Sequence, residues 1–305
     1  MAARASLGHN RVNALTIDVE DWFQVQALEG AVSRDSWDRR ELRVARNTER
    51  ILGLLSDAGC RATFFILGWI ARREPALLRR IADGGHEIAS HGMEHRRVDR
   101  QTPASLRGDV AATKALLEDT TGVAVRGYRA PSFSIGARQF WAYERLAEAG
   151  YTYSSSVYPV RHDSYGIPDA PRLPFRPRNA PRIVELPLPT LAVGRLNLPA
   201  GGGGFFRLLP YAASRWAIAR LNAAERLDCI FYFHPWEIDP DQPRIAGLRA
   251  RSQMRHYLNL GRMEARLVRL LKDFAWDRLD RVHAESLGAP ERLPLWAPGA
   301  PGRAR

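Results

Sequence analysis

The chain has 305 residues, of which 45% are hydrophobic and 26% charged, and its formal net charge is +12. This composition can bury the core of one large α/β domain or of two small ones, and it excludes a disordered chain. No apolar run reaches the roughly 18 residues of a transmembrane helix, and the first residues lack the apolar core of a signal peptide. We therefore expect a cytoplasmic protein without a transmembrane segment, with peripheral association with the inner membrane as an alternative.

The positive charge comes almost wholly from arginine, because lysine occurs only at Lys114 and Lys272. The arginines are spread along the chain, which indicates a solvated surface and no specific nucleic-acid partner; attraction to anionic polymers is a lesser alternative. Two cysteines, Cys60 and Cys229, are too few for a disulfide framework and are expected to be small buried thiols. The composition does not predict an oligomeric state.

An apolar run at 15–19 opens the chain and ends in three acids within four positions, Asp18, Glu20 and Asp21. The irregular segment 23–43 that follows is expected to lie across the mouth of the fold. Predicted strands and helices then alternate. The predicted strands are 62–67, 85–90, 125–128, 151–156, 183–186 and 228–233, and the predicted helices are 47–55, 75–82, 102–117, 137–149, 210–221 and 249–273.

This alternation predicts parallel strands joined by crossover helices, an α/β fold with functional residues at the C-terminal ends of the strands. We expect a flexible N-terminus at 1–12, one catalytic domain at 13–285 and a disordered tail at 286–305. Within the domain, the proline-rich segment 157–204 has no period and is expected to be an insertion that shapes a substrate groove. The glycines at 201–204 are expected to form a mobile loop.

His91 and His95 are the first candidate metal ligands. Four positions apart, they would share one face if the backbone turned helical after Ser90, and both rings could then reach one ion. Such a pair on a loop is more often two solvated histidines, so a third ligand is needed. The acids after the first strand are the best source, because three acids behind a buried run repel one another and a cation offsets this. A helix-capping acidic turn is the alternative for any one of them.

Three motifs give the chain a family resemblance: DVEDWF at 18–23, RAPSF at 129–133 and HPWE at 234–237. In this order, between about 15 and 245, they resemble the NodB-type polysaccharide deacetylases, which are carbohydrate esterases. More narrowly, they resemble the subgroup encoded with exosortase-linked exopolysaccharide systems. The resemblance implies a distorted (β/α)7-type barrel. It also implies a hydrolase that removes N-acetyl groups from an acetylated polysaccharide or oligosaccharide.

The resemblance further implies a divalent metal held by His91, His95 and one carboxylate, with zinc expected and cobalt, nickel or manganese as alternatives. The family usually has Asp-Asp after its first strand, the first being the catalytic base and the second the ligand. Here Asp18 matches the base, but Val19 stands in the place of the ligand. The ligand therefore moves to Glu20 or Asp21, and we select Glu20 because relatives with an Asp-x-acid arrangement keep the acid there.

By the same resemblance, Arg129 pairs with Asp18 and holds it ionised and oriented. His234 is the general acid that protonates the departing amine. The substrate is expected to lie against Pro131, Phe133 and Trp236. Simpler alternatives are a surface Arg129 and a core His234. Many relatives tune the acid with an aspartate near position 154, which is Ser154 here, so the partner of His234 is left open.

Two other functions are alternatives. One is a hydrolase of linear amides on the same fold that works without a metal; the presence of both His91 and His95 argues against it. The other is a non-catalytic polysaccharide-binding protein that uses the basic surface and the aromatic residues of the segment 157–204.

Overall fold

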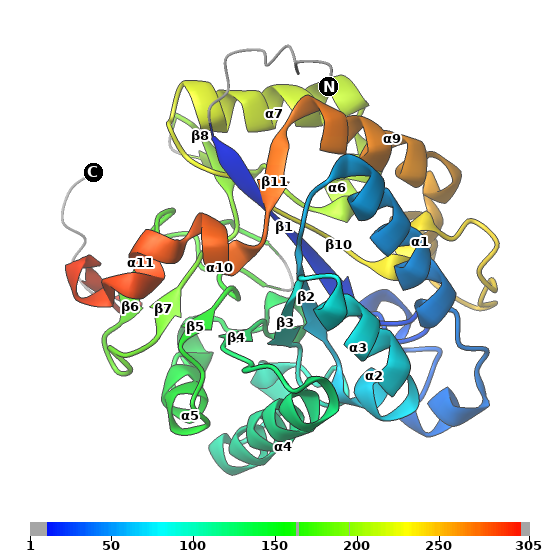
Figure 1. The fold of residues 1–305 in the computed structure, drawn as a ribbon, viewed down its shortest axis with the longest axis horizontal. Helices are drawn as coiled ribbons and strands as arrows, with labels where there is room; N and C mark the ends of the chain where they lie inside the picture. The colour runs from blue at the N-terminus through cyan, green and yellow to red at the C-terminus, as the bar shows by residue number, and fades with distance from the viewer. Residues whose placement is uncertain (1–10, 163–164, 195, 300–305) are drawn as a thin grey trace.

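The computed structural model describes residues 11–162, 165–194 and 196–299. Its centre is a parallel sheet with the strand order β10-β1-β2-β3-β4-β5-β7, and β11 also pairs with β1 (Figure 1). The strands are β1 (Val12–Val19), β2 (Thr63–Ile66), β3 (Glu87–Ser90), β4 (Gly127–Tyr128), β5 (Tyr153–Ser154), β7 (Val184–Glu185), β10 (Ile230–Phe233) and β11 (Ala275–Asp277). Within the described residues, β7 and β10 do not pair, so the sheet forms an open barrel.

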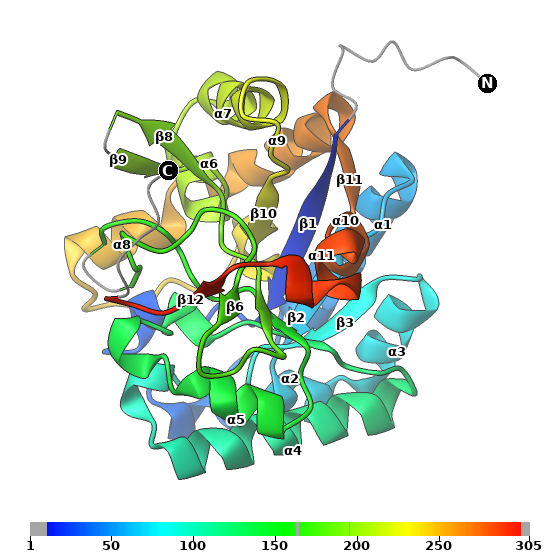
Figure 2. The same ribbon diagram turned by 90° about the vertical axis from the view of Figure 1, so that its left-hand side faces the viewer.

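Helices connect most of the successive strands and pack around the sheet (Figures 1 and 2). Because helices cover the sheet, its strands are buried and almost continuously apolar, as in β2, where all four residues are buried. The predicted alternation of strands and helices is confirmed. The helices are α1 (Val44–Ala58), α2 (Gly68–Arg73), α3 (Pro75–Asp83), α4 (Pro103–Thr121), α5 (Ala142–Glu148), α6 (Gly203–Leu208), α7 (Tyr211–Ala223), α8 (Ala250–Tyr257), α9 (Leu260–Asp273), α10 (Leu279–Val282) and α11 (Ala284–Gly288).

The proline-rich segment 157–204 contains the strand predicted near 183–186, which is β7, and three more short strands. These are β6 (Arg176–Pro177) and an antiparallel hairpin of β8 (Thr190–Val193) and β9 (Leu196–Pro199). In the glycine run, Gly201, Gly202 and Gly203 pack closely against β10 and the residues after it, whereas Gly204 is exposed. A Cβ atom on Gly202 would lie 2.6 Å from the Tyr232 ring, and a Cβ atom on Gly203 would lie 2.1 Å from Glu237 Oε1.

The expectation of a disordered tail after residue 286 is wrong for the residues described up to 299. There β12 (Leu295–Trp296) pairs in parallel with β6. The Trp296 ring also packs edge-on against Phe140 and Phe175, with centroid distances of 5.6 and 5.2 Å. One aromatic anchor therefore offsets the entropy cost of ordering a proline-rich segment. Of the expected flexible N-terminus, residues 1–10 lie outside the described residues, and Val12 already belongs to β1.

The helix predicted over 249–273 is instead two helices, α8 and α9. The chain is extended at Leu258 and left-handed at Asn259, where φ is +55°. The break is stabilised by Arg207, whose Nη1 donates to the carbonyl oxygens of His256 and Leu258 at 2.9 and 2.7 Å. Sequence periodicity could not show this, because the stabilising side chain lies some fifty positions earlier in the chain.

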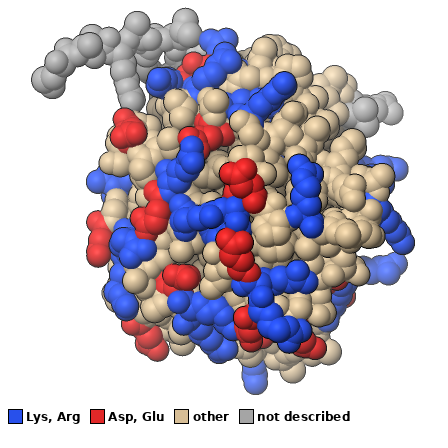
Figure 3. Space-filling view, turned by 90° about the vertical axis from the view of Figure 1, so that its right-hand side faces the viewer, with Lys and Arg blue, Asp and Glu red and all other residues tan. Residues whose placement is uncertain are grey.

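The surface agrees with the expectation of a solvated, arginine-biased exterior: on the face shown in Figure 3, basic and acidic side chains are interspersed. Across the described part of the chain, every helix is too short or too polar to cross a lipid bilayer. Within the described residues, Cys229 is buried, Cys60 is half-buried, and neither forms a disulfide.

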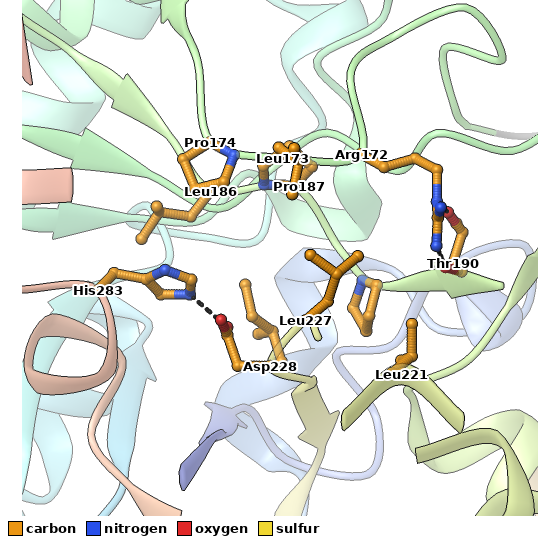
Figure 4. A pocket seen from close by; sticks show the side chains of 12 residues that line it. Arg172, Leu173, Pro174, Leu186, Pro187, Thr190, Leu221, Leu227, Asp228 and His283 are labelled. Atoms are coloured by element: carbon orange, nitrogen blue, oxygen red, sulfur yellow. Dashed lines mark hydrogen bonds and ion pairs between the residues drawn. The ribbon is translucent and has the colours of Figure 1, made fainter. Parts of the chain in front are cut away.

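A small pocket lies beside Asp228, just before β10, at the opposite end of that strand from His234 (Figure 4). His283 Nε2 lies 3.1 Å from Asp228 Oδ2 in its wall. Its volume of about 30 Å³ admits one or two waters and no larger ligand.

We predict that Trp296→Ala lowers the free energy of unfolding by about 1–3 kcal/mol, because it removes the aromatic anchor of the tail. Thermal or urea denaturation measures the effect. The matched control is Trp216→Ala, since the Trp216 side chain is 56% exposed and its loss should change stability by less than about 0.5 kcal/mol. Equal effects of the two substitutions would contradict an ordered tail.

Candidate active site

The C-terminal ends of the parallel strands bring most of the predicted residues together. Asp18 lies at the end of β1, and His91, Arg129 and His234 directly follow β3, β4 and β10. Because the strands are parallel, these ends meet at one edge of the sheet. The His234 side chain is 19% exposed, whereas those of Asp18 and Arg129 are 3% and 0% exposed, so the group opens to solvent beside His234.

Arg129 is fully buried and pairs with Asp18, as predicted. Its Nη1 donates to Asp18 Oδ1 at 2.7 Å and to Thr16 Oγ1 at 2.8 Å. The other side of the guanidinium donates to the carbonyl and hydroxyl oxygens of Ser155, and its face covers the Phe65 ring at 4.0 Å. A planar fork with this many partners fixes the direction of the Asp18 carboxylate.

The ring of His91 is oriented by the same residue. His91 Nδ1 lies 2.8 Å from the carbonyl oxygen of Arg129. A carbonyl only accepts, so Nδ1 carries the proton and Nε2 presents its lone pair. Burial lowers the pKa of His91 to about 4, which keeps the imidazole neutral at physiological pH. A neutral imidazole with one free nitrogen is a metal ligand.

His95 reaches the site from a loop and not from the helix that was considered. The chain after Ser90 is left-handed at Gly92 and at His95, with φ of +79° and +51°. This places the His91 and His95 rings 5.4 Å apart. Arg34 supports the loop by donating to the carbonyl oxygens of Glu94 and His95 at 3.2 and 3.3 Å. A left-handed histidine costs conformational energy, and such strain concentrates at functional sites.

Glu20 completes the group. The strand ends at Val19, where the Glu20 amide donates to the Asp18 carbonyl at 3.0 Å, yet the Glu20 side chain turns inward. Its Oε2 lies 3.0 Å from His95 Nε2 without hydrogen-bond geometry, and it is buried with no partner. Burial raises the pKa of Glu20, but His95 and His234 outweigh it and lower the pKa to about 2.

One ligand atom each from Glu20, His91 and His95 lies within 4.8 Å of the others; among the described residues, this is the only such cluster of His, Cys, Asp and Glu. The buried, unpartnered carboxylate oxygen and the neutral imidazole fit a divalent cation, because a cation would satisfy lone pairs that no protein donor satisfies. Two imidazoles and one carboxylate are a ligand set suited to zinc and other first-row metals.

Asp21, the alternative ligand, is occupied elsewhere. Its Oδ1 accepts from the amide of Trp22 at 2.8 Å. Its Oδ2 accepts from the amides of Arg43 and Val44 at 2.7 and 2.9 Å, at the start of α1. Burial raises the pKa of Asp21 to about 6. This is the capping role considered for one of the acids, and the geometry favours Glu20 over Asp21 as the metal ligand.

His234 faces both carboxylates. Its Nε2 lies 3.2 Å from Glu20 Oε1 and 3.9 Å from Asp18 Oδ2, while its Nδ1 lies 2.8 Å from Glu237 Oε1. Burial lowers the pKa of His234, but the charges of Glu20 and Glu237 outweigh it and raise the pKa to about 9. The carboxylate that contacts Nδ1 of His234 is thus that of Glu237, and not one from a residue near position 154.

The residues expected to contact substrate are mostly packed inside the protein. Pro131 is buried and Phe133 is 6% exposed, with its ring against Tyr158 and Tyr232. Trp236 is also 6% exposed and stacks on the His234 ring at 5.2 Å, and its Nε1 lies 3.4 Å from Glu20 Oε1. Phe133 and Trp236 are therefore largely covered by neighbouring side chains, and their contact with a substrate stays a prediction.

A cavity of about 360 Å³ lies next to His95. The segment 23–43, expected to lie across the mouth, forms much of its wall with two short 3₁₀ turns at Gln26–Leu28 and Arg34–Arg39. The wall includes Phe23, Gln24, Arg34, Trp37 and Ser132. The sequence did not identify which residues of the segment 23–43 line the cavity, because the segment has no period. Its length and its position after β1 did indicate that it lies across the mouth of the fold.

Two models of known families match the chain, one for polysaccharide deacetylase over residues 35–154 and one for a domain of unknown function (DUF3473) over residues 155–284. Residues 35–154, less than half of the chain, are thus similar to a polysaccharide deacetylase domain. The deacetylase model includes His91, His95 and Arg129, whereas the model of unknown function includes His234. Asp18 and Glu20 precede both.

Curated deacetylases are similar to parts of the chain. A chitooligosaccharide deacetylase from Bradyrhizobium sp. (strain ANU 289) is 34% identical over 85 residues, which are 28% of this chain and 39% of the relative. A peptidoglycan-N-acetylglucosamine deacetylase from Bacillus cereus is 32% identical over 99 residues, 32% of this chain and 36% of the relative. The chain thus spans less than half the length of these relatives.

A solved structure extends the comparison to the whole chain. The crystal structure of a proposed polysaccharide deacetylase from Mycobacterium smegmatis matches with a TM-score of 0.58 at 21% identity, over 100% of this chain and 98% of the other. Together with the parallel sheet, this confirms the predicted deacetylase barrel fold.

We predict that Glu20→Gln weakens zinc binding by more than the roughly 10–100-fold that loss of an outer hydrogen-bond partner costs, because it removes a direct ligand. Asp21→Asn should keep zinc affinity but destabilise the fold by about 1–3 kcal/mol, because its amide cannot accept all three backbone hydrogen bonds. Competition with a chromophoric chelator and thermal denaturation measure the two effects. Loss of zinc in Asp21→Asn with intact Glu20→Gln binding would reverse the assignment.

Proposed function

We propose that the protein is a metal-dependent hydrolase that removes the acetyl group from N-acetylhexosamine units of an exopolysaccharide or its precursor. The observation that carries this proposal is the convergence of Glu20, His91 and His95 beside Asp18 and His234. The deacetylase match over 35–154 supports the same reaction class.

Zinc is the proposed metal, with cobalt, nickel or manganese as alternatives, held by Glu20 and by one nitrogen of each histidine. When bound, such an ion supplies a Lewis acid for the acetyl carbonyl and for the attacking water.

Asp18 is the proposed general base. Arg129 holds its Oδ1, which leaves Oδ2 directed toward the space in front of His234. There Oδ2 can take a proton from water as the water oxygen bonds to the acetyl carbon. The hydrogen bond from the buried arginine prevents the carboxylate from turning away.

His234 is the proposed general acid. Its Nε2 donates a proton to the sugar nitrogen as the carbon–nitrogen bond breaks, which leaves a free amine and acetate. Burial lowers the pKa of His234, but the charges of Glu20 and Glu237 raise it to about 9. The imidazole therefore holds this proton at neutral pH. The His234 side chain is 19% exposed. Those of His95, Glu20, Asp18 and Arg129 are at most 7% exposed, so His234 is the most accessible of these groups.

The proposed substrate is an acetylated polysaccharide or oligosaccharide. The cavity of about 360 Å³ beside His95 is in the range of small-ligand sites, and both apolar and polar residues line it, among them Phe23, Trp37, Gln24 and Arg34. Two similar proteins are named as deacetylases of chitooligosaccharides and of peptidoglycan N-acetylglucosamine.

We predict that the zinc-loaded protein releases acetate from N-acetylglucosamine oligomers, and that exhaustive chelation abolishes release until zinc is restored. Asp18→Asn should lower kcat by about 100-fold or more, because it removes the base while keeping the shape of the side chain. Acetate is measured by a coupled assay or by NMR. Asp228→Asn is the matched control: its carboxylate is paired with His283 at the opposite end of β10, and kcat should stay at the parent value.

The alternatives give different results. Acetate release that survives full removal of metal favours the linear-amide hydrolase without a metal. Polymer binding that Asp18→Asn leaves intact, with no acetate release by the parent protein, favours the non-catalytic binding protein.

A further inference from the structure

The segment of unknown function, residues 155–284, supplies more to the site than His234. Glu237 from the same turn and Arg207 from α6 form a buried chain of contacts behind the imidazole. Both side chains are at most 2% exposed, so neither meets solvent. Arg207 and Glu237 are 30 positions apart in the sequence, so the sequence motifs did not reveal their contact.

Glu237 contacts His234 twice through one oxygen. Its Oε1 accepts from the His234 backbone amide at 3.1 Å and lies 2.8 Å from His234 Nδ1. The backbone contact alone is an ordinary helix-start arrangement. The contact to Nδ1 is not needed for that role, and an ionised carboxylate there accepts, so Nδ1 must donate its proton. Although burial opposes it, Arg207 and His234 lower the pKa of Glu237 below its ordinary value, which keeps it ionised.

Arg207 fixes the carboxylate in turn. Its Nε donates to Glu237 Oε2 at 2.6 Å. Its two Nη groups donate to the carbonyl oxygens of Arg255, His256 and Leu258, at the break between α8 and α9. The guanidinium is therefore anchored to backbone on one side and aims at Glu237 on the other, a geometry that lysine could not reproduce.

The glycine run provides the space for this arrangement. A Cβ atom on Gly203 would lie 2.1 and 2.3 Å from the two Glu237 carboxylate oxygens, so only glycine admits the carboxylate there. The Arg207 guanidinium also lies over the Trp236 ring, 5.2 Å from its centroid, and Trp236 stacks on the His256 ring at 4.4 Å.

We propose that Glu237 and Arg207 are positioning residues for His234: they hold the proton on Nδ1 and direct Nε2 into the reaction space. This inference rests on the proposed function, in which Nε2 delivers the proton to the leaving amine. It gives the segment of unknown function a role, which is to carry the acid and the buried pair that orients it. Glu237 and Arg207 act only through His234 and touch no reacting atom.

The first test uses activity. In the zinc-loaded protein, Glu237→Gln should lower kcat for N-acetylglucosamine oligomers by about 10–100-fold, a part of what general acid catalysis contributes. KM and zinc affinity should stay within about threefold, because the substituted residue contacts neither substrate nor ligands. The matched control is Asp239→Asn, which breaks another buried ion pair, with Arg43, just after the same turn and should leave kcat unchanged.

The second test needs no turnover. In ¹⁵N-labelled protein, the Nδ1 proton of His234, assigned by its loss in His234→Gln, should exchange slowly with water, and Glu237→Gln should make it exchange fast. An unprotonated Nδ1, an unchanged exchange rate or an unchanged kcat in folded Glu237→Gln would each overturn the inference. If Glu237→Gln does not fold, Arg207→Lys is expected to show the same two changes in smaller measure. If the parent protein releases no acetate, the proposed function fails, and the exchange measurement still decides how the ring is held.

Discussion

The buried ion pair between Arg129 and Asp18 is the interaction on which the rest of the site depends. A charged pair without solvent is tolerated when its hydrogen bonds are satisfied, and here Thr16 and Ser155 accept from three of the four N–H groups that do not bond Asp18. Because those partners come from β1 and from the residues after β5, the guanidinium fixes how far apart the two parts of the sheet stand. The same residue offers its carbonyl to His91, so one arginine orients both the proposed base and a proposed ligand.

The site is divided along the chain in a way that matches the two family models. The part that matches polysaccharide deacetylase provides the two histidines of the proposed metal site and Arg129. The part of unknown function provides His234 with its buried partners Glu237 and Arg207. A segment that matches a family model of its own can be an accessory domain that folds apart from the barrel. Here its β10 pairs directly with β1, beside the proposed base, so it belongs to the barrel itself.

Sequence reasoning named side chains that the structure brings together, but it did not predict the geometry that does so. It paired His91 with His95 through a helical period, whereas two left-handed residues in a loop bring the rings together. It preferred Glu20 to Asp21, and the physical reason, amides at the start of α1, lies more than twenty positions away in the chain. The roles of these residues stay predictions.

The same limit explains what the sequence did not reveal. Arg207 lies between the segment 157–204 and the helix predicted at 210–221, and nothing local marks it as a partner of Glu237. Phe133 and Trp236 were expected against the substrate by family resemblance; both are 6% exposed, and their contact with a substrate stays a prediction. Motif order predicted the barrel well, since strands and helices are encoded locally. The tail instead depends on distant contacts, which are the pairing of β12 with β6 and the packing of Trp296 against Phe140 and Phe175.

The position of β1 has a consequence for how this protein is made. The first strand lies between β2 and β10, and its residues Ala14 to Ile17 pair with residues 230–233, more than two hundred positions later. A nascent chain emerging from the ribosome therefore holds an apolar strand with one open edge until most of the protein has been synthesised. Such a strand invites aggregation, so folding in the cell is expected to be slow and to benefit from chaperones that shield exposed edges.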